Sequence, residues 1–456
     1  MFSHLMLRKL LSDEQGLGSE RYQMVFLEKI YMNNLFTAAI LIISYILITR
    51  RRSPANLYDP IIYFYYYHLV FFGIGLLYFD LLWDRDIEKS SQLVPVLLLL
   101  QYSILIYICD ILLRRRKLSA EKLRDLICSS GCKYSNRMIS GAYLVFAIGV
   151  ACSAIYVHLA IGFDSFLSAG LDDVRVVGRQ GYGWLALVSI SAITVPAIYI
   201  MLASIVANKQ GKSFIVVIVA FCVLLTIGNR GPAFEILVFY IVTLFLTKKG
   251  RIDFKWGLTF AIFSFLLLGA LNLFRQGDEF SFALLCSKSL WRPYVNIDNF
   301  NVVYNYFQHS SSALYGYGYF LDFSVIMPGY QPNFGLWFKE IAGMDFTGGG
   351  VTVTYAGEIL ANFGKYPLFI ISSFYFFIIY LCSLLFLHRN MSCLRLTHIF
   401  ILSITLKSVV SSGIVSPIIY TYIPMVVILV ILRLVANALF LFCGALPSQS
   451  IKINVK

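Results

Sequence analysis

The sequence predicts an all-α polytopic membrane protein, and three observations lead to this fold class. Of its 456 residues, 59% are hydrophobic and only 13% are charged, whereas soluble domains have about 45–50% apolar and about 25% charged residues. The mean hydropathy is +0.76. Apolar runs of the length that crosses about 30 Å of hydrocarbon as a helix recur along the chain. A soluble globular protein is thereby excluded, and we expect a single integral membrane domain over 1–456.

About eleven apolar runs are long enough to be transmembrane helices. They lie at about 34–49, 61–83, 93–113, 139–161, 184–207, 214–228, 232–247, 257–274, 367–387, 397–413 and 417–432. The sixth and seventh runs are separated only by the polar tip Asn229-Arg230-Gly231, so we expect a helical hairpin there. Pro232 fits a first helical position, because that position needs no backbone N–H donor.

Lys and Arg residues predict the orientation, because those near the ends of spans stay on the cytoplasmic side. Arg50, Arg51 and Arg52 follow the first run, and eight basic residues lie between Arg114 and Arg137. Basic loops recur on this same side, which places the N-terminus outside and the C-terminus inside. The formal net charge of +13 is explained by this inner belt facing anionic lipid, so no nucleic-acid partner is needed.

Four segments are expected to lie outside the spans. Residues 1–33 hold several charges and lack the apolar core of a cleavable signal peptide, so we expect them to form an outer surface segment. A loop over 162–183 and a large loop over 275–366 lie on the same outer face as the Arg230 tip. Residues 433–456 form a cytoplasmic tail.

The large loop over 275–366 is the most informative stretch for function. Connections longer than about 15 residues are usually functional or disordered, and disordered segments are poor in aromatic residues. This loop is dense in Tyr, Phe and Trp. We therefore expect a folded cap whose rings stack on sugars or other flat substrates. The candidate sugar-binding residues are Tyr315, Tyr317, Tyr319, Trp337, Asn362 and His309.

Arginine side chains at the outer face are the candidate anion-binding groups. A guanidinium offers a planar fork of donors that matches phosphate oxygens, and it does not deprotonate. Arg175 and Arg179 are four residues apart, so they share a helical face or flank a turn. The alternative is a solvated loop in which Asp172 and Asp173 pair with them.

Arg230 is the sharpest of these candidates, because it stands at a hairpin tip on the face where arginine is disfavoured. Its charge needs a partner or a polar cavity; the alternative is an interface residue bound to lipid phosphate. Lys407 lies within the tenth apolar run and indicates a polar interior shared with the cap. The full candidate anion-binding set is Arg175, Arg179, Arg230, Arg275, Arg292 and Lys407.

Glu358 is the candidate catalytic carboxylate. It shares one face of a short re-entrant helix with Asn362, four residues on. A carboxylate at this depth has a raised pKa and could serve as a base. The alternative is a structural hydrogen bond to Asn362 or to a backbone amide. The other outer carboxylates are expected to be solvated or paired with Lys and Arg, and they are Asp278, Glu279, Asp298, Asp322 and Asp345.

No cofactor or metal is expected. Among the nine cysteines, Cys128 and Cys132 are close in sequence but have no histidine partners, and most of the others lie in or beside apolar runs, where they behave as small apolar residues. The chain has no nucleotide-binding glycine loop with Lys-Ser or Lys-Thr. It also lacks the inverted repeats that many secondary transporters use.

The order of these parts resembles the Wzy-type O-antigen and oligosaccharide repeat-unit polymerases over about 139–425. The shared parts are the stretch from Arg175 to Gly183, the Gly228-Asn229-Arg230-Gly231 turn, Arg275, the Tyr-rich loop and the Glu358-x-x-x-Asn362-Phe363-Gly364 ending. The Arg-x10-Gly pattern of some members does not follow Arg175, Arg179 or Arg230. A mechanism built on that motif is therefore not carried over.

The resemblance implies a metal-independent glycosyltransferase of GT-C-like architecture in the bacterial inner membrane, inverting or retaining. Such enzymes transfer a growing glycan from undecaprenyl pyrophosphate onto the next lipid-linked repeat unit at the periplasmic face, sometimes together with a chain-length regulator. The outer face of this chain, with its N-terminus, would be periplasmic. The candidate cations would bind pyrophosphate, with Arg230 and Glu358 in catalytic roles.

Three other classes of protein are compatible with parts of the pattern. An O-antigen ligase uses the same donor but transfers the glycan to a lipid A core, and only His309 could supply the histidine of its outer loop. A membrane-bound acyltransferase needs a buried histidine in a span, for which His158 is a poor candidate. A lipid-linked glycan flippase or transporter is disfavoured by the large cap and by the lack of repeat symmetry.

Overall fold

The structure is a computed structural model of the chain in which only part of the sequence is described. The described residues are 19–52, 59–76, 89–113, 136–162, 171–207, 209–228, 230–247, 266–267, 269–270, 273, 280–309, 313–324, 332–344, 350–387 and 392–442. All regular elements in these ranges are helices. The prediction of an all-α fold is therefore confirmed for them.

The helices outside the large loop follow one another along the whole chain. They are α2 (Ser19–Arg51), α3 (Pro60–His68), the π-helical η1 (Leu69–Ile74), α5 (Lys89–Leu112), α7 (Asn136–Tyr156), η2 (Val157–Ile161), α9 (Leu171–Val206), α10 (Gln210–Thr226), α11 (Arg230–Thr247), α18 (Leu368–Leu387), α19 (Cys393–Ser412), α20 (Val415–Pro417), η3 (Ile418–Tyr422) and α21 (Ile423–Phe442). The large loop contributes α13 (Phe282–Ser289), α14 (Trp291–His309), α15 (Tyr317–Ser324), α16 (Phe334–Ile341) and α17 (Tyr355–Phe363).

Six stretches of described helix are long and apolar enough to cross a membrane. They are Asn34–Arg51, Leu93–Leu112, Arg137–Ala160, Tyr182–Val206, Cys393–Ser412 and Val415–Leu439. Shorter apolar helices cover three more of the expected spans, at Gln210–Thr226, Gly231–Leu244 and Leu368–Leu384. The chain is thus a multi-pass membrane protein. The expected 61–83 span is seen as α3 and η1, and most of the 257–274 span lies outside the described residues, so the count of about eleven stays a prediction.

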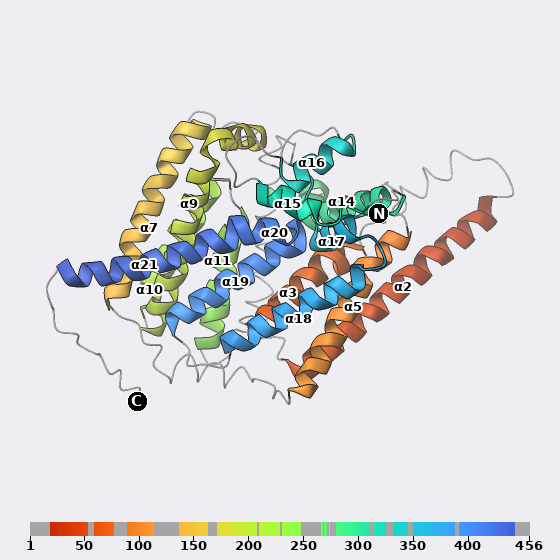
Figure 1. The fold of residues 1–456 in the computed structure, drawn as a ribbon, viewed down its shortest axis with the longest axis horizontal. Helices are drawn as coiled ribbons and strands as arrows, with labels where there is room; N and C mark the ends of the chain where they lie inside the picture. The colour runs from red at the N-terminus through yellow and green to blue at the C-terminus, as the bar shows by residue number, and fades with distance from the viewer. Residues whose placement is uncertain are drawn as a thin grey trace.

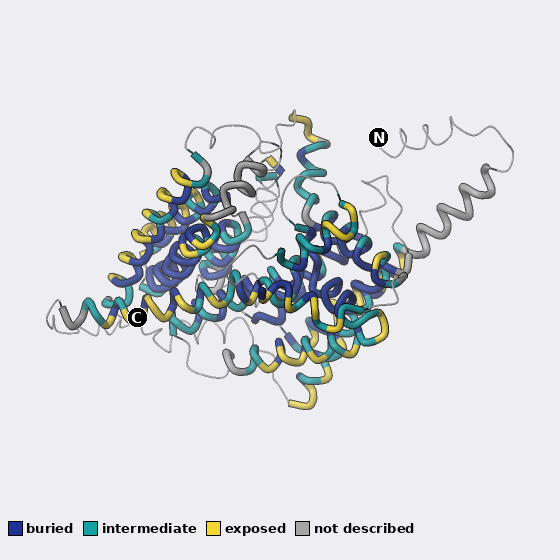
Figure 2. Tube along the Cα trace, turned by 45° about the horizontal axis from the view of Figure 1, so that its top comes forward, coloured by how far each residue is buried: buried dark blue, intermediate teal, exposed yellow. Residues whose placement is uncertain are grey.

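The helices pack around two hydrophobic cores that share α19 (Figure 1). Helices α7, α9, α10, α11 and α21 enclose the first core, and α2, α3, α5 and α18 enclose the second together with helices of the large loop. In an apolar 18-residue stretch within Tyr182–Val206, 83% of the residues are buried, against 28% in the corresponding stretch within Arg137–Ala160. Helix α9 is therefore central, whereas α7 keeps an apolar face for lipid, and Figure 2 shows this contrast between buried and exposed residues.

Helices of the large loop gather at one end of the bundle, where α14 and α17 pack together (Figure 1). A polar side chain just before a helix accepts a hydrogen bond from its first turn in three cases. Ser281 begins α13 in this way, Asn333 begins α16, and Thr354 begins α17. Phe300 and Val303 of α14 are fully buried. We call α13–α17 the cap.

Three sequence boundaries differ from those expected, each because a helix is longer than its apolar run. Helix α2 begins at Ser19, inside the expected surface segment 1–33. Helix α9 begins at Leu171, so the second half of the expected 162–183 loop is helical; Asp172 and Asp173 lie in its first turn, where carboxylates stabilise a helix. Helix α21 continues to Phe442, into the expected tail 433–456.

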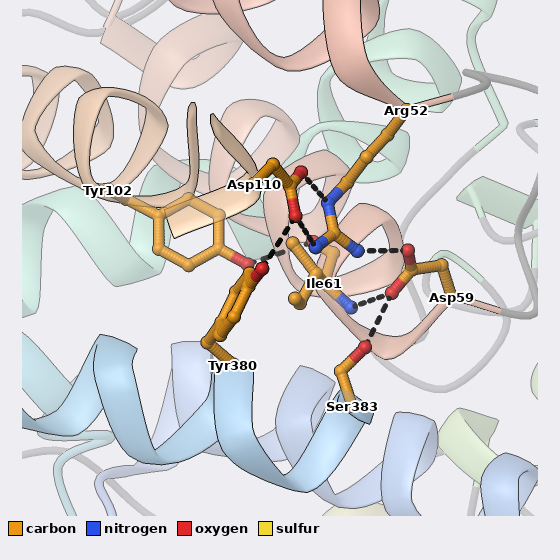
Figure 3. Close-up of polar contacts among 7 residues, drawn as sticks. All are labelled: Arg52, Asp59, Ile61, Tyr102, Asp110, Tyr380 and Ser383. Carbon is orange, nitrogen blue, oxygen red and sulfur yellow. Dashed lines mark hydrogen bonds and ion pairs between the residues drawn. The ribbon is translucent and has the colours of Figure 1, made fainter. Parts of the chain in front are cut away.

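Figure 3 shows a buried ionic cluster in which Arg52 lies between Asp59 and Asp110. Arg52 forms two hydrogen bonds with Asp110, at 2.9 Å from Nε and 2.8 Å from Nη2, and a third from Nη1 to Asp59. Tyr380 donates to Asp110 over 2.8 Å, and Ser383 donates to Asp59 over 3.1 Å. The cluster joins α2, α5 and α18 to the start of α3. Arg52, expected to belong to the exposed inner belt, is instead 5% exposed.

Candidate functional site

Most of the predicted arginines are placed only by their backbone. Arg230 is the first residue of α11, Arg175 and Arg179 lie in the first turns of α9, and Arg292 lies in the first turn of α14. Their side chains, that of His309 and all of Arg275 fall outside the described residues. The described part of the site consists of two polar clusters, one around Lys407 and one around Glu358.

In the Lys407 cluster, a lysine and a glutamate pair inside the membrane bundle. The Lys407 ammonium lies 2.6 Å from Oε1 of Glu235, with a side chain that is 18% exposed against 1% for Glu235. Tyr67 donates its hydroxyl proton to the same oxygen over 2.7 Å, and its ring lies 5.2 Å from the Lys407 ammonium. A buried charge needs such a partner, because desolvation alone costs several kcal/mol.

This cluster lies directly beside the start of α11. A Cβ atom added at Gly231 would lie 3.6 Å from the Lys407 ammonium, so the residue after Arg230 is in contact distance of the lysine. Glu235 was not among the predicted site residues. Its signal was present in the sequence, because a lone carboxylate inside an apolar run requires a partner, and Lys407 is the lone cation of another run.

In the Glu358 cluster, a buried carboxyl of the cap contacts the turn between α19 and α20. Glu358 is 1% exposed, and its Oε2 atom accepts the backbone N–H of Ile414. Val415 also donates its backbone N–H to this carboxyl. The Oε1 atom is buried without a hydrogen-bond partner in the described part of the chain. The hydrogen bond to a backbone amide, left open by the sequence, is therefore present, and one oxygen remains for another group.

Gly413 makes this contact possible. Its φ angle is +94°, in a region that only glycine adopts without strain. An added Cβ atom would lie 2.9 Å from Oε2 of Glu358 and 3.2 Å from the carbonyl oxygen of Val353. The carboxyl can approach the Ile414 amide only because residue 413 has no side chain.

Asp322 lies at the same turn, contrary to the expectation that it is solvated or paired with a cation. It is 4% exposed and accepts the backbone N–H of Phe334 over 2.9 Å and that of Ser416. Burial raises the pKa of Asp322 to about 6, although these two donors oppose the effect. Burial also raises the pKa of Glu358, and the negative charge of Asp322 adds to it.

Asn362 connects the helices on either side of this cluster. Its Nδ2 atom donates to the Glu358 backbone carbonyl over 2.8 Å, and its Oδ1 atom accepts the N–H of Gly318 over 2.9 Å. Asn362 is 0% exposed. Both functional groups of its amide are thus bonded within the protein, and we assign it a role in holding α17 against α15 in place of the expected sugar contact.

The predicted aromatic residues are divided between two environments. Tyr315 is 83% exposed and Tyr317 48% exposed, and the ring of Tyr317 lies 6.0 Å from the half-buried Trp337. These three can form an outer aromatic surface. Tyr319 is partly buried, with its ring 5.9 Å from that of Phe363, and burial and then the nearby Glu358 raise its pKa.

Helix α19 connects the two clusters. Lys407 and Gly413 are six residues apart in sequence, which is about 9 Å along a helix. The Lys407–Glu235 pair, which lies beside the start of α11, is therefore about 9 Å along α19 from the turn that Glu358 and Asp322 contact. No protein-family model, curated protein or solved structure matches this chain.

Proposed function

We propose that the protein is a membrane glycosyltransferase that polymerises oligosaccharide repeat units carried on undecaprenyl pyrophosphate. The observation that supports this most is the Glu358 carboxyl, which a helix of the aromatic cap carries into the junction with the membrane helices. One of its oxygens is unpartnered among the described residues. The Lys407 ammonium lies beside the start of α11, of which Arg230 is the first residue. A sugar acceptor and a lipid-linked anion could meet there.

The chemistry divides between the acid and the arginines. The acceptor hydroxyl gives its proton to Glu358, its oxygen bonds to the anomeric carbon of the donor, and the bond from that carbon to the pyrophosphate oxygen breaks. The electron pair leaves on pyrophosphate, where fixed positive charge stabilises it. Arg230 is the proposed main contact, with Arg175, Arg179, Arg275 and Arg292 around it. Lys407 contributes as one half of its pair with Glu235.

The substrates set the cellular location of the proposed enzyme. Undecaprenyl-linked repeat units are joined at the periplasmic face of the bacterial inner membrane, so the cap is placed in the periplasm. Membrane lipids surround the bundle, and a chain-length regulator is a proposed protein partner. The exposed Tyr315 and Tyr317 would stack on sugar rings.

Topology is the first test. A reporter fused at Ser119 is expected to be cytoplasmic and one inserted near Ser311 periplasmic, because basic loops stay inside. Paired alkaline phosphatase and fluorescent-protein fusions measure this. A cytoplasmic signal at Ser311 would place the cap on the wrong side for the proposed reaction.

Activity is tested by incubating the purified protein with lipid-linked repeat units, alone and with lipid A core. A ladder of polymers in the first reaction supports the proposal. Transfer that requires the lipid A core would identify a ligase, for which His309 would be the histidine to examine. Movement of intact substrate across vesicles without transfer would identify a flippase.

The Arg230→Ala variant is expected to lose polymer formation at an unchanged protein level. Arg230→Lys should restore it poorly, because a point charge does not replace a bidentate fork. Polymer length and amount on gels measure the effect, and Arg179 and Arg292 variants should show weaker losses. A near-normal ladder from Arg230→Ala would return Arg230 to a lipid-anchoring role.

A buried histidine bears on the acyltransferase alternative. His68 of α3 is fully buried. Its Nε2 atom lies 2.9 Å from the carbonyl oxygen of Pro95, and its Nδ1 atom lies 3.0 Å from the Tyr355 hydroxyl. Both ring nitrogens are thus used to hold α3, α5 and α17 together. This geometry favours a structural histidine over a catalytic one.

A further inference from the structure

The turn between α19 and α20 presents consecutive backbone N–H groups to two different carboxyls. Ile414 and Val415 donate to Glu358, and Ser416 donates to Asp322. The two acids come from different cap helices, α17 and α15, and approach the turn separately. Successive backbone nitrogens lie less than about 4 Å apart, so the carboxyls themselves are neighbours.

We infer that Asp322 and Glu358 form one coupled two-carboxyl proton site, in which Asp322 is the positioning residue and Glu358 carries the exchangeable proton. The assignment of roles follows from their contacts. Asp322 is bonded to backbone of both the α16 start, at Phe334, and the α20 start. Glu358 keeps the Oε1 atom, buried and without a described partner, for a proton or a substrate hydroxyl.

Among the described residues, the groups around the pair are hydroxyls and backbone amides. Tyr319 on α15 and Tyr375 on α18 lie near enough to Glu358, and Tyr420 on η3 near enough to Asp322, to interact with them electrostatically. No ion pair among the described residues involves either acid. Two carboxylates in one buried site oppose each other's ionisation, so the two protons of the pair are lost in two separate steps.

The consequence for catalysis rests on the proposed function. Burial raises the pKa of Asp322 to about 6, and burial together with the Asp322 charge raises the pKa of Glu358 well above its ordinary value, so Glu358 keeps its proton to a higher pH than an exposed glutamate does. A base must be unprotonated, so turnover should rise with pH as Glu358 ionises. Removing the Asp322 charge should move this rise to lower pH.

Infrared difference spectroscopy on the purified full-length protein, without substrate, tests the pair directly. The carbonyl band of protonated carboxyls is followed through a pH titration, and Glu358→Gln identifies the band that belongs to Glu358. In Asp322→Asn, whose amide oxygen can still accept the two N–H groups, that band should disappear at a pH about one unit lower or more. Glu340→Gln, at an exposed acid of α16, is the control and should leave it unchanged.

If Asp322→Asn folds poorly, the coupling can still be tested by titrating the Asp322 band in Glu358→Gln. Coupling acts equally in both directions, so in Glu358→Gln the Asp322 band should also disappear at lower pH. Unchanged midpoints in both variants would overturn the inference. If the midpoints shift as expected while the protein polymerises nothing at any pH, the two-carboxyl site stands and the proposed function fails.

Discussion

Arg52→Met is expected to lower the stability of the protein by about 3–5 kcal/mol, the cost of removing one partner from a buried ion pair. The arginine is the cation of a cluster that contains two carboxylates, Asp59 and Asp110, with side chains that are 4% and 1% exposed. Its loss would leave both charges buried without their cation. Many proteins are stable by only about 5–15 kcal/mol, so a large fall in folded yield should accompany it.

Lysine should not replace Arg52. Two of its three contacts form a fork on Asp110, with Nε and Nη2 bonded to separate oxygens, and the guanidinium also lies 5.4 Å from the centre of the Tyr380 ring. An ammonium cannot reproduce a planar fork that also reaches Asp59. The N-terminus of α3 supplies the remaining compensation, because Asp59 also accepts the N–H of Ile61 over 3.1 Å.

Thermal unfolding of detergent-purified variants is monitored by size-exclusion chromatography, which measures the folded protein that remains after heating. Arg50→Met is the matched control, since Arg50 is exposed two residues away on the same helix. Asp110→Asn should be nearly as harmful as Arg52→Met, and the double variant less harmful than the sum of the two. Melting of Arg52→Met at the temperature of Arg50→Met would contradict the cluster's role.

Arg52 shows that the retention of Lys and Arg on the cytoplasmic side predicts topology better than it predicts side-chain contacts. That rule makes no distinction between Arg50, Arg51 and Arg52, because it depends only on their charge and their place near the end of a span. Which of them turns inward depends on Asp110, 58 residues away. Only the packing of α2 on α5 brings that carboxylate within reach. Apolar runs, by contrast, act locally, and they were sufficient to predict the all-helical fold.

Contacts between residues close in sequence were predicted correctly at the candidate site, whereas contacts between distant segments were not. Glu358 and Asn362 share a helix, and their four-residue spacing places them together on α17, where Asn362 bonds to the Glu358 carbonyl. The sequence alone predicts that Asp322 is solvated or paired with Lys or Arg. Its actual neighbour is the 413–416 turn, about 90 residues further along the chain, counting from 322 to 413, and no local pattern contains that information.

Helix ends show the same limit. Hydropathy located the apolar part of α9 but not its start at Leu171, because the first turns are polar and end near Gly183. The acidic pair Asp172 and Asp173 is a helix-start signal, whereas it was considered only as an alternative partner of the arginines in a solvated loop. Placing Arg175 and Arg179 on a helix brings them to one face, as the four-residue spacing allowed.

Gly413→Ala is expected to reduce turnover by about 10²-fold or more, the lower range for loss of a placed base, with a smaller loss of stability. Alanine at φ +94° and ψ −175° occupies a region that is essentially restricted to glycine and costs about 1–3 kcal/mol. Its Cβ atom would lie 2.9 Å from Oε2 of Glu358. The carboxyl would have to leave the Ile414 amide, and with it the position in which it meets the acceptor.

Gly364→Ala separates the two effects, because Gly364 has nearly the same backbone, with φ +83° and ψ 179°, but nothing within 4 Å of an added Cβ atom. Both variants should melt at lower temperature by similar amounts, since both carry the same backbone strain. Only Gly413→Ala should lose polymer formation beyond what its melting temperature explains, and its Glu358 infrared band should titrate at a different pH. Both variants carry the backbone strain, but only Gly413→Ala displaces the Glu358 carboxyl. Equal activity in the two variants would therefore show that the contact between Glu358 and the 413–416 turn is not needed for turnover.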